Sequence, residues 1–213
     1  MRVLITPVTG FQQNSSLIWS ERSGRGAVID PGGDLEQILA AAKEHGVTIE
    51  KLLVTHAHID HAGGTAALAR ELGDCPIEGP HRDDQFWIDM LGTQGGRYGI
   101  PGEPFTPTRW LAQGDVVTVG DETLEVLHCP GHTPGHVVFF HREARVAFVG
   151  DVLFQGSIGR TDFPRGDHAT LIASIRERLW PLGDDVTFVP GHGPTSTFGY
   201  ERQTNPFVGD DAL

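Results

Sequence analysis

The sequence has little cysteine, few basic side chains and no long apolar run. Its two cysteines, Cys75 and Cys129, form no Cys-x-x-Cys motif and are too few for a disulfide framework, so we expect a reducing compartment. No apolar stretch approaches the ~20 residues that a membrane-spanning helix needs. The first residues contain no apolar core of a signal peptide. We therefore expect a cytoplasmic protein that does not bind membranes.

Basic residues are outnumbered by acidic ones, 16 against 28, which gives a formal net charge of −12. Nucleic-acid-binding proteins normally carry a basic patch or stripe, and none is visible here, so nucleic acid is not an expected partner. The acidic balance has two interpretations. It can serve solubility alone, or part of it can be neutralised by bound cations, so that the formal charge overstates the charge of the loaded protein.

The order of the predicted elements indicates an α/β fold with two sheets, each covered on its outer side by helices. We expect residues 1–213 to form a single domain. Residues 92–109, rich in Gly and Pro, are predicted to be a loop, and Asp34 is predicted to cap a helix. The patterns predict strands at 2–8, 15–20, 26–30, 51–55, 115–120, 123–129, 136–141, 145–150 and 186–189, and helices at 35–45, 64–71, 80–91 and from Asp167 or Thr170 to 179.

The densest cluster of metal-binding side chains is His56-Ala57-His58-Ile59-Asp60-His61. Residues two apart in an extended segment point to the same side, so His56 and His58 can hold one cation together. Asp60 and His61 follow where the chain turns into a helix, and they can serve a second cation. Imidazole and carboxylate ligands together suit zinc, iron or manganese rather than calcium.

Three further candidate ligands follow predicted strands. His132 lies in the turn Pro130-Gly131-His132, Asp151 comes after an apolar strand, and His192 follows another within Pro190-Gly191-His192. Sites in α/β proteins gather at strand ends. Two cations can share all seven ligands if Asp151 bridges them. His136 either supports a ligand or is a satisfied strand residue.

The chain resembles the metallo-β-lactamase superfamily, since the seven residues match the superfamily's five motifs in order and spacing. Within it, the stretches 127–136, 159–167 and 182–200 are similar to the short glyoxalase II-like hydrolases. The resemblance covers the whole chain and implies an αββα sandwich of two mixed sheets flanked by helices. It also implies two divalent metal ions, zinc first and iron or manganese next. Metal 1 would be held by His56, His58 and His132, metal 2 by Asp60, His61 and His192, with Asp151 between them.

This resemblance implies hydrolysis of a small-molecule thioester, S-lactoylglutathione or a similar acylthiol. A metal-bridging hydroxide would attack the carbonyl, and the thiolate leaves readily because a thiol has a pKa of about 8.5. Asp60 is the candidate catalytic residue that orients the hydroxide. We expect no counterpart of the C-terminal helical domain that supplies glutathione contacts in longer glyoxalase II enzymes. Arg160 occupies the position of a cationic glutathione contact, and Arg97 and Tyr98 could cover the site.

The alternative function is a glutathione persulfide dioxygenase, a similar enzyme that binds one iron through positions such as His56, His132 and Asp151. Oxygen consumption distinguishes it from anaerobic hydrolysis. A β-lactamase is disfavoured because several such enzymes have cysteine at the position of Asp151. A metal-binding module without catalysis is disfavoured by the presence of both Asp60 and Asp151. Cys129 is expected to be a buried small residue, and Asn14 a turn residue.

Overall fold

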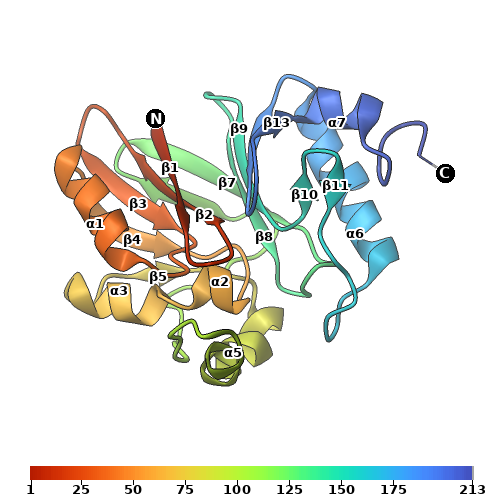
Figure 1. Ribbon diagram of the computed structural model, residues 1–213. Coiled ribbons are helices and arrows are strands. Elements are labelled where there is room, and N and C mark those ends of the chain that lie inside the picture. Colours follow the sequence, from red (N-terminus) through yellow and green to blue (C-terminus); the bar gives the residue numbers. More distant parts are fainter. Residues whose placement is uncertain (213) are drawn as a thin grey trace.

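A computed structural model describes residues 1–212, and its first half is built on a five-stranded sheet (Figure 1). The strands lie in chain order. β2 is antiparallel to its neighbours β1 and β3, and β4 and β5 then continue the sheet parallel to β3. Their bounds are β1 Arg2–Val8, β2 Gln13–Trp19, β3 Arg25–Ile29, β4 Thr48–Leu53 and β5 Ile77–Glu78.

A six-stranded sheet forms the second half, in the order β13-β12-β9-β8-β7-β6. Only β12 and β9 are parallel, so both large sheets are mixed. Its strands are β6 Val116–Val119, β7 Glu122–His128, β8 Val137–His141, β9 Val146–Gly150, β12 Thr187–Pro190 and β13 Ser196–Thr197. A small hairpin of β10 Leu153–Phe154 and β11 Ser157–Ile158 follows β9.

Helices cover the outer faces of both sheets: α1 and α3 lie against the first, α6 and α7 against the second (Figure 1). The helices of the first half are α1 Leu35–Glu44, α2 Ile59–Ala62, α3 Thr65–Glu71, η1 Arg82–Asp84, α4 Gln85–Asp89 and α5 Leu91–Tyr98. Those of the second half are α6 His168–Ser174, the π-helical turn η2 Ile175–Leu179, η3 Trp180–Leu182 and α7 Phe198–Thr204.

Three apolar layers hold this arrangement together, and the alternation along β8 shows how. Phe139 packs into the layer between the two sheets, whereas Phe140 packs into the layer under α6 and α7. Both side chains are fully buried, because a central strand of a sandwich has a covered surface on each face. A third layer lies between the first sheet and α1 and α3. The expected αββα sandwich is therefore confirmed.

Three local predictions were wrong. Residues 92–109 are not all loop, because α5 extends to Tyr98, and the predicted helix at 80–91 is divided into η1 and α4. Asp34 precedes α1, but its carboxylate does not cap the helix. It accepts a hydrogen bond from Thr9 N, 2.7 Å away, and so ties the β1–β2 turn to the start of α1.

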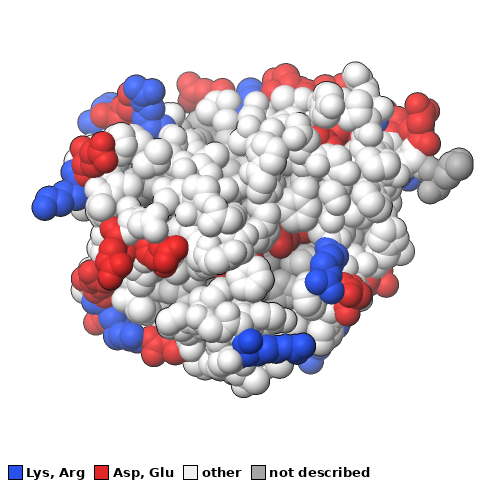
Figure 2. Space-filling model, in the orientation of Figure 1, with Lys and Arg blue, Asp and Glu red and all other residues white. Residues whose placement is uncertain are grey.

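The face shown in Figure 2 has most of its charged side chains near the periphery and a hollow to the right of its centre. Acidic groups lie at depth in this hollow, and basic groups lie at its rim. Within residues 1–212 no helix is both long enough and apolar enough to span a membrane. The hollow lies where the ends of both sheets meet.

Candidate metal centre

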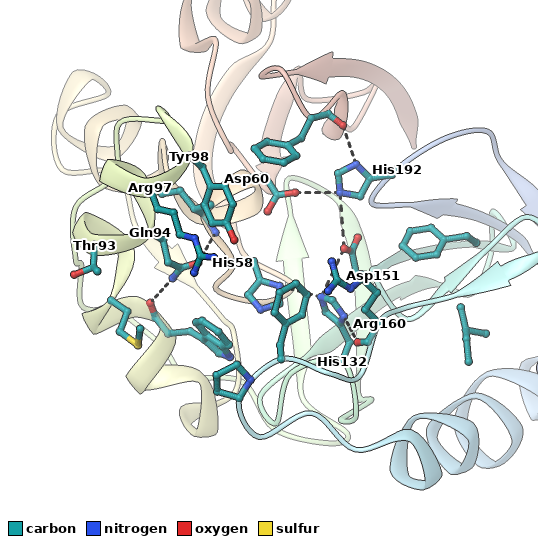
Figure 3. Close-up of a pocket in the computed structure, with 18 of the residues that line it drawn as sticks. His58, Asp60, Thr93, Gln94, Arg97, Tyr98, His132, Asp151, Arg160 and His192 are labelled. Atoms are coloured by element: carbon teal, nitrogen blue, oxygen red, sulfur yellow. Dashed lines mark hydrogen bonds and ion pairs between the residues drawn. The ribbon is translucent and has the colours of Figure 1, made fainter.

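The histidine-rich segment runs from the end of β4 into α2. Residues up to His58 are extended, and the chain then turns into the short helix at Ile59. His56 and His61 are fully buried, and His58 is 8% exposed. Of these three side chains, His58 lines a cavity of about 980 Å³, together with Asp60, His132, Asp151 and His192, and α5 forms one of its walls (Figure 3).

One group of possible ligands consists of His56, His58 and His132, whose candidate ligand atoms lie within 4.8 Å of one another. His132 reaches the group from the β7–β8 loop, and its Nε2 atom lies 2.9 Å from His58 Nδ1. Burial lowers the pKa of all three imidazoles. They are therefore neutral and offer the lone pairs that a metal ion requires.

A second group, Asp60, His61 and His192, lies beside the first. The Nε2 atom of His192 is 3.1 Å from Asp60 Oδ2, and that of His61 is 3.8 Å from the same oxygen. Burial alone would lower the pKa of His61 and His192, but the neighbouring carboxylates outweigh it and raise both.

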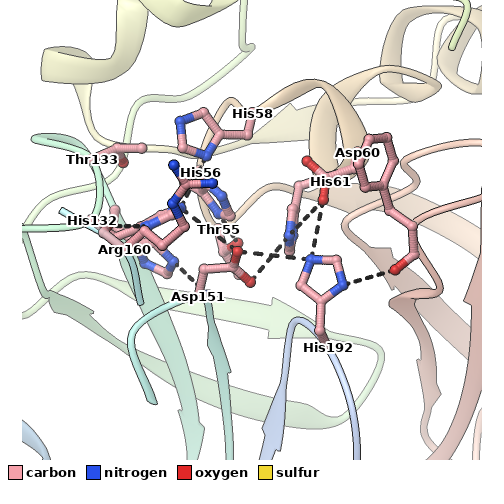
Figure 4. Close-up of polar contacts among 12 residues, drawn as sticks. Thr55, His56, His58, Asp60, His61, His132, Thr133, Asp151, Arg160 and His192 are labelled. Atoms are coloured by element: carbon pink, nitrogen blue, oxygen red, sulfur yellow. Dashed lines mark hydrogen bonds and ion pairs between the residues drawn. The ribbon is translucent and has the colours of Figure 1, made fainter. Parts of the chain in front are cut away.

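Asp151 lies between the two groups (Figure 4). Its Oδ1 atom is 3.2 Å from His61 Nε2, and its Oδ2 atom is 3.6 Å from His132 Nε2. One carboxylate thus faces both groups, which is the geometry of a bridging ligand. Gly191, directly after β12, packs so closely against Asp151 that a Cβ atom at this position would clash with Asp151 Oδ1.

In three of the imidazoles the Nδ1 atom is held by a hydrogen bond, so that Nε2 faces the centre, whereas His58 faces it with Nδ1. His61 Nδ1 donates to Asp30 Oδ2 at 2.9 Å, His132 Nδ1 to Arg160 O at 2.7 Å, and His192 Nδ1 to Phe11 O at 3.1 Å. A proton fixed on Nδ1 leaves the lone pair on Nε2, which defines the ligand tautomer.

Buried polar atoms without hydrogen-bond partners indicate whether these residues fit metal ions. Within the described chain, three buried atoms of the centre have no hydrogen-bond partner: His56 Nε2, His61 Nε2 and Asp151 Oδ1. Buried polar atoms are rarely left unpaired unless they serve a ligand or ion. The donor set of imidazoles and carboxylates is also the one that zinc, iron and manganese accept. The residues therefore fit a metal centre.

Asp84 was missed in the sequence, and it joins the two ligand-bearing loops. It is fully buried at the end of η1. Its carboxylate accepts hydrogen bonds from Ala57 N at 3.0 Å, Thr133 Oγ1 at 2.9 Å and Gly135 N at 2.6 Å. Ala57 separates two candidate ligands and Thr133 follows a third. No sequence motif marks Asp84, because its partners lie 27 to 51 residues away.

Two other residues support the centre. Asn14 lies in β2 rather than in a turn, so that prediction was wrong, and its Nδ2 atom donates to Pro190 O and Gly193 O on either side of His192. His136 accepts a hydrogen bond from Asp151 N at 3.1 Å, so it supports a ligand. Cys129 is buried as predicted, and burial raises the pKa of its thiol to about 12.

Arg160, the residue predicted to contact substrate, also lines the cavity. Its guanidinium group is exposed and makes two hydrogen bonds to Asp162, at 2.9 and 2.7 Å. Figure 3 places Arg97 and Tyr98 on the other side of the cavity. Six of the predicted site residues therefore line one cavity, namely His58, Asp60, His132, Asp151, His192 and Arg160, whereas His56 and His61 are fully buried and do not line it.

An αββα sandwich with histidines and aspartates at one edge defines a class of metal-dependent hydrolases. The model of the metallo-beta-lactamase superfamily matches residues 8–192, and the chain belongs to this superfamily. The chain is an enzyme of the metallo-hydrolase type, whose fold binds divalent metal ions.

Among its relatives, the chain is 47% identical to hydroxyacylglutathione hydrolase GloC of Haemophilus influenzae, over 98% of each protein. It is 36% identical to the probable metallo-hydrolase YqgX of Bacillus subtilis, over 97% of each. A solved structure of TTHA1623 in a di-iron-bound form is 37% identical and has a TM-score of 0.87. The match covers 97% of this chain and all of the other. The B3 metallo-beta-lactamase BLEG-1 is 34% identical, with a TM-score of 0.89 and coverage of 97% and 99%.

Proposed function

We propose that the protein hydrolyses a thioester, S-lactoylglutathione or a similar acylthiol. The observation that carries this proposal is the position of Asp151, whose carboxylate faces both groups of possible ligands at the floor of one cavity. The identity of 47% with a hydroxyacylglutathione hydrolase supports the choice of substrate.

The proposed ligand sets follow the two groups. His56, His58 and His132 would hold one metal, Asp60, His61 and His192 would hold the other, and Asp151 would contact both. Zinc is the proposed metal, with iron or manganese as alternatives. When bound, such a pair polarises a carbonyl group and lowers the pKa of water in the site.

The chain's own residues then act on the substrate and on water. Asp60 is the candidate catalytic residue, since its carboxylate lines the cavity and can accept a hydrogen bond from the attacking water, which it thereby orients. Trp87 and Phe163 pack against His58, with ring centroids 4.6 and 4.8 Å away, and they exclude bulk water from that side. The thiolate leaves without an acid, because a thiol has a pKa of about 8.5.

The test is the anaerobic loss of thioester absorbance of S-lactoylglutathione, with metal-loaded wild type compared with His58→Ala. We expect metal-dependent hydrolysis by the wild type and its loss in the variant. His168→Ala is the matched control, because this exposed histidine lies at the start of α6, outside the cavity. The absence of hydrolysis, together with oxygen uptake on glutathione persulfide by protein with one iron, would replace the proposal with the dioxygenase alternative.

A further inference from the structure

A further group of metal-binding side chains lies outside the cavity, where the start of η1 meets the end of β7. It consists of His81, Asp83 and His128, whose candidate ligand atoms lie within 4.8 Å of one another. His81 directly precedes η1, Asp83 lies within it, and His128 is the last residue of β7. None of the three is among the described residues that line the cavity. Two imidazoles and one carboxylate thus meet on another part of the molecule.

The ring of His128 is already held in the orientation of a ligand. Its Nε2 atom lies 2.9 Å from Pro134 O. A carbonyl oxygen only accepts, so Nε2 carries the proton and Nδ1 keeps the lone pair that a metal ion requires. Burial lowers the pKa of this imidazole, so it is neutral at pH 7. A backbone carbonyl that holds the outer nitrogen is a common support of metal-bound histidines.

The spacing of His81 and Asp83 fits a small cation. His81 Nδ1 lies 3.4 Å from Asp83 Oδ2. Two ligand atoms at about 2.0–2.1 Å from a tetrahedral zinc ion lie roughly 3.3–3.5 Å apart. Within the described chain the Asp83 carboxylate, which is 60% exposed, forms no ion pair except with His81. The contact that a cation would replace is the hydrogen bond from Asp83 N to His81 Nδ1, which is long at 3.2 Å.

The two imidazole rings lie against each other, with centroids 4.2 Å apart and 22° between their planes. A shared cation requires one of these stacked rings to turn toward the other's lone pair. His128 is held by Pro134, so the rotation falls to His81, whose side chain is 24% exposed and is free to turn about its Cβ–Cγ bond.

We infer that His81, Asp83 and His128 form a third metal site, which binds a divalent transition-metal ion, zinc first. Two imidazoles and one carboxylate are a donor set that zinc accepts, whereas calcium and magnesium prefer oxygen ligands alone. Because the site lies at the surface, water can supply the fourth ligand.

The position of this site gives the ion a structural role. His81 N donates to Gly135 O at 3.0 Å, and His128 donates to the neighbouring Pro134 O. Both carbonyls belong to the β7–β8 loop, which carries His132. Asp84 joins the same loop to η1 from the buried side. An ion at the third site would reinforce this junction from the solvent side without contact with substrate.

The test is calorimetric titration with zinc of protein whose centre is already loaded. We expect wild type to bind one further zinc ion per chain, and His128→Gln and Asp83→Asn each to raise the Kd of that ion by about tenfold or more, since each removes one of three protein ligands. Magnesium should not bind there. Zinc at about 100 times its Kd should raise the Tm of wild type by about 5–11 °C.

His168→Gln is the matched control, because this exposed histidine lies at the start of α6, outside both sites. The exposed position of Asp83 separates loss of a ligand from loss of folding, and Asp83→Asn should leave the affinity of the centre unchanged in competition with a chelator. The inference is overturned if wild type binds no further zinc ion, or if the Kd is the same in wild type, His128→Gln and Asp83→Asn. An equal rise in His168→Gln would also overturn it.

Discussion

At the scale of single residues, Asp60 has two proposed roles, as a metal ligand and as the group that orients the attacking water. Its carboxylate is 17% exposed toward the cavity and 3.1 Å from His192 Nε2, so it can both hold a metal and orient water. We expect Asp60→Asn with full metal loading to lower kcat by about 10²–10⁴, the usual contribution of a positioned acid or base. Metal analysis and steady-state kinetics on the same samples test this. Wild-type turnover at full loading would refute the catalytic role.

Asp84 is expected to act on metal binding through the loops that it joins. In Asp84→Asn an amide NH₂ group replaces one carboxylate oxygen and faces a donor, so at least one of the three hydrogen bonds is lost. Loss of a group that orients ligands typically weakens metal binding about 10- to 100-fold. Competition with a chelator measures this, with the exposed neighbour Asp83→Asn as control. Equal affinities in the two variants would contradict the role of Asp84.

The same residue gives the metal-free protein a pH dependence. Burial raises the pKa of the Asp84 carboxyl to about 7, against about 3.9 in an unfolded chain. The contribution of this group to stability is therefore complete below about pH 4 and is lost as the pH rises to about 7. Between pH 5 and pH 8 we expect the unfolding free energy of wild type to fall by about 2–3 kcal/mol relative to Asp84→Asn. If urea unfolding gives wild type and Asp84→Asn the same dependence of unfolding free energy on pH, the raised pKa of Asp84 is contradicted.

At the scale of elements, α5 is fixed by one buried glutamine. Gln94 accepts a hydrogen bond from Ile59 N at the start of α2, and it donates to Trp87 O in α4, both at 3.2 Å. Gln94→Ala leaves Ile59 N without a partner, whereas Trp87 O keeps its hydrogen bond from Met90 N at 3.1 Å. The unpaired N–H group should cost about 1–3 kcal/mol of unfolding free energy. Urea unfolding measures this, with the exposed Thr93→Ala as control. If the two variants are equally stable, α5 is held by other contacts.

The elements also show what the sequence could predict. Strong apolar alternation marked the central strands, and Asp167 caps α6 by accepting from Thr170 N at 2.7 Å, one of the two predicted starts. In contrast, α5 contains three glycines that disfavour a helix, and its stability comes from tertiary contacts such as those of Gln94. Local patterns do not record such contacts.

In the candidate site, too, residues in local sequence patterns could be predicted, and residues that act through tertiary contacts could not. The seven predicted metal ligands lie close together in the structure. They could be proposed from the sequence because short spacing such as His56-x-His58 and Gly-rich strand ends are visible in the chain. Asp84 and Asn14 were missed or misassigned, because their functional contacts are with backbone groups of distant loops. A single aspartate or asparagine carries no local signal of such a partner.

At the scale of the whole molecule, metal binding should stabilise the fold, because the ligands come from both sheets. Cations at about 1,000 times their Kd add about 4 kcal/mol of stability, and for a chain of this size each kcal/mol raises Tm by about 2–4 °C. Chelation should therefore lower Tm by about 8–16 °C, and added zinc should restore it. Calorimetry of loaded, stripped and reloaded protein measures this. An unchanged Tm would mean that the folded chain does not hold the metals tightly.

The distribution of the ligands between the two sheets also determines when the centre can assemble during synthesis. Asp30 and His56 belong to the first half of the chain, whereas His192 follows β12, near the end of the second. A nascent chain leaves the ribosome from its N-terminus, so the first sheet can fold while the last ligand has not yet been made. Complete loading is therefore a late event, and a chain truncated before Pro190 would lack His192 and keep only two members of the second group of ligands.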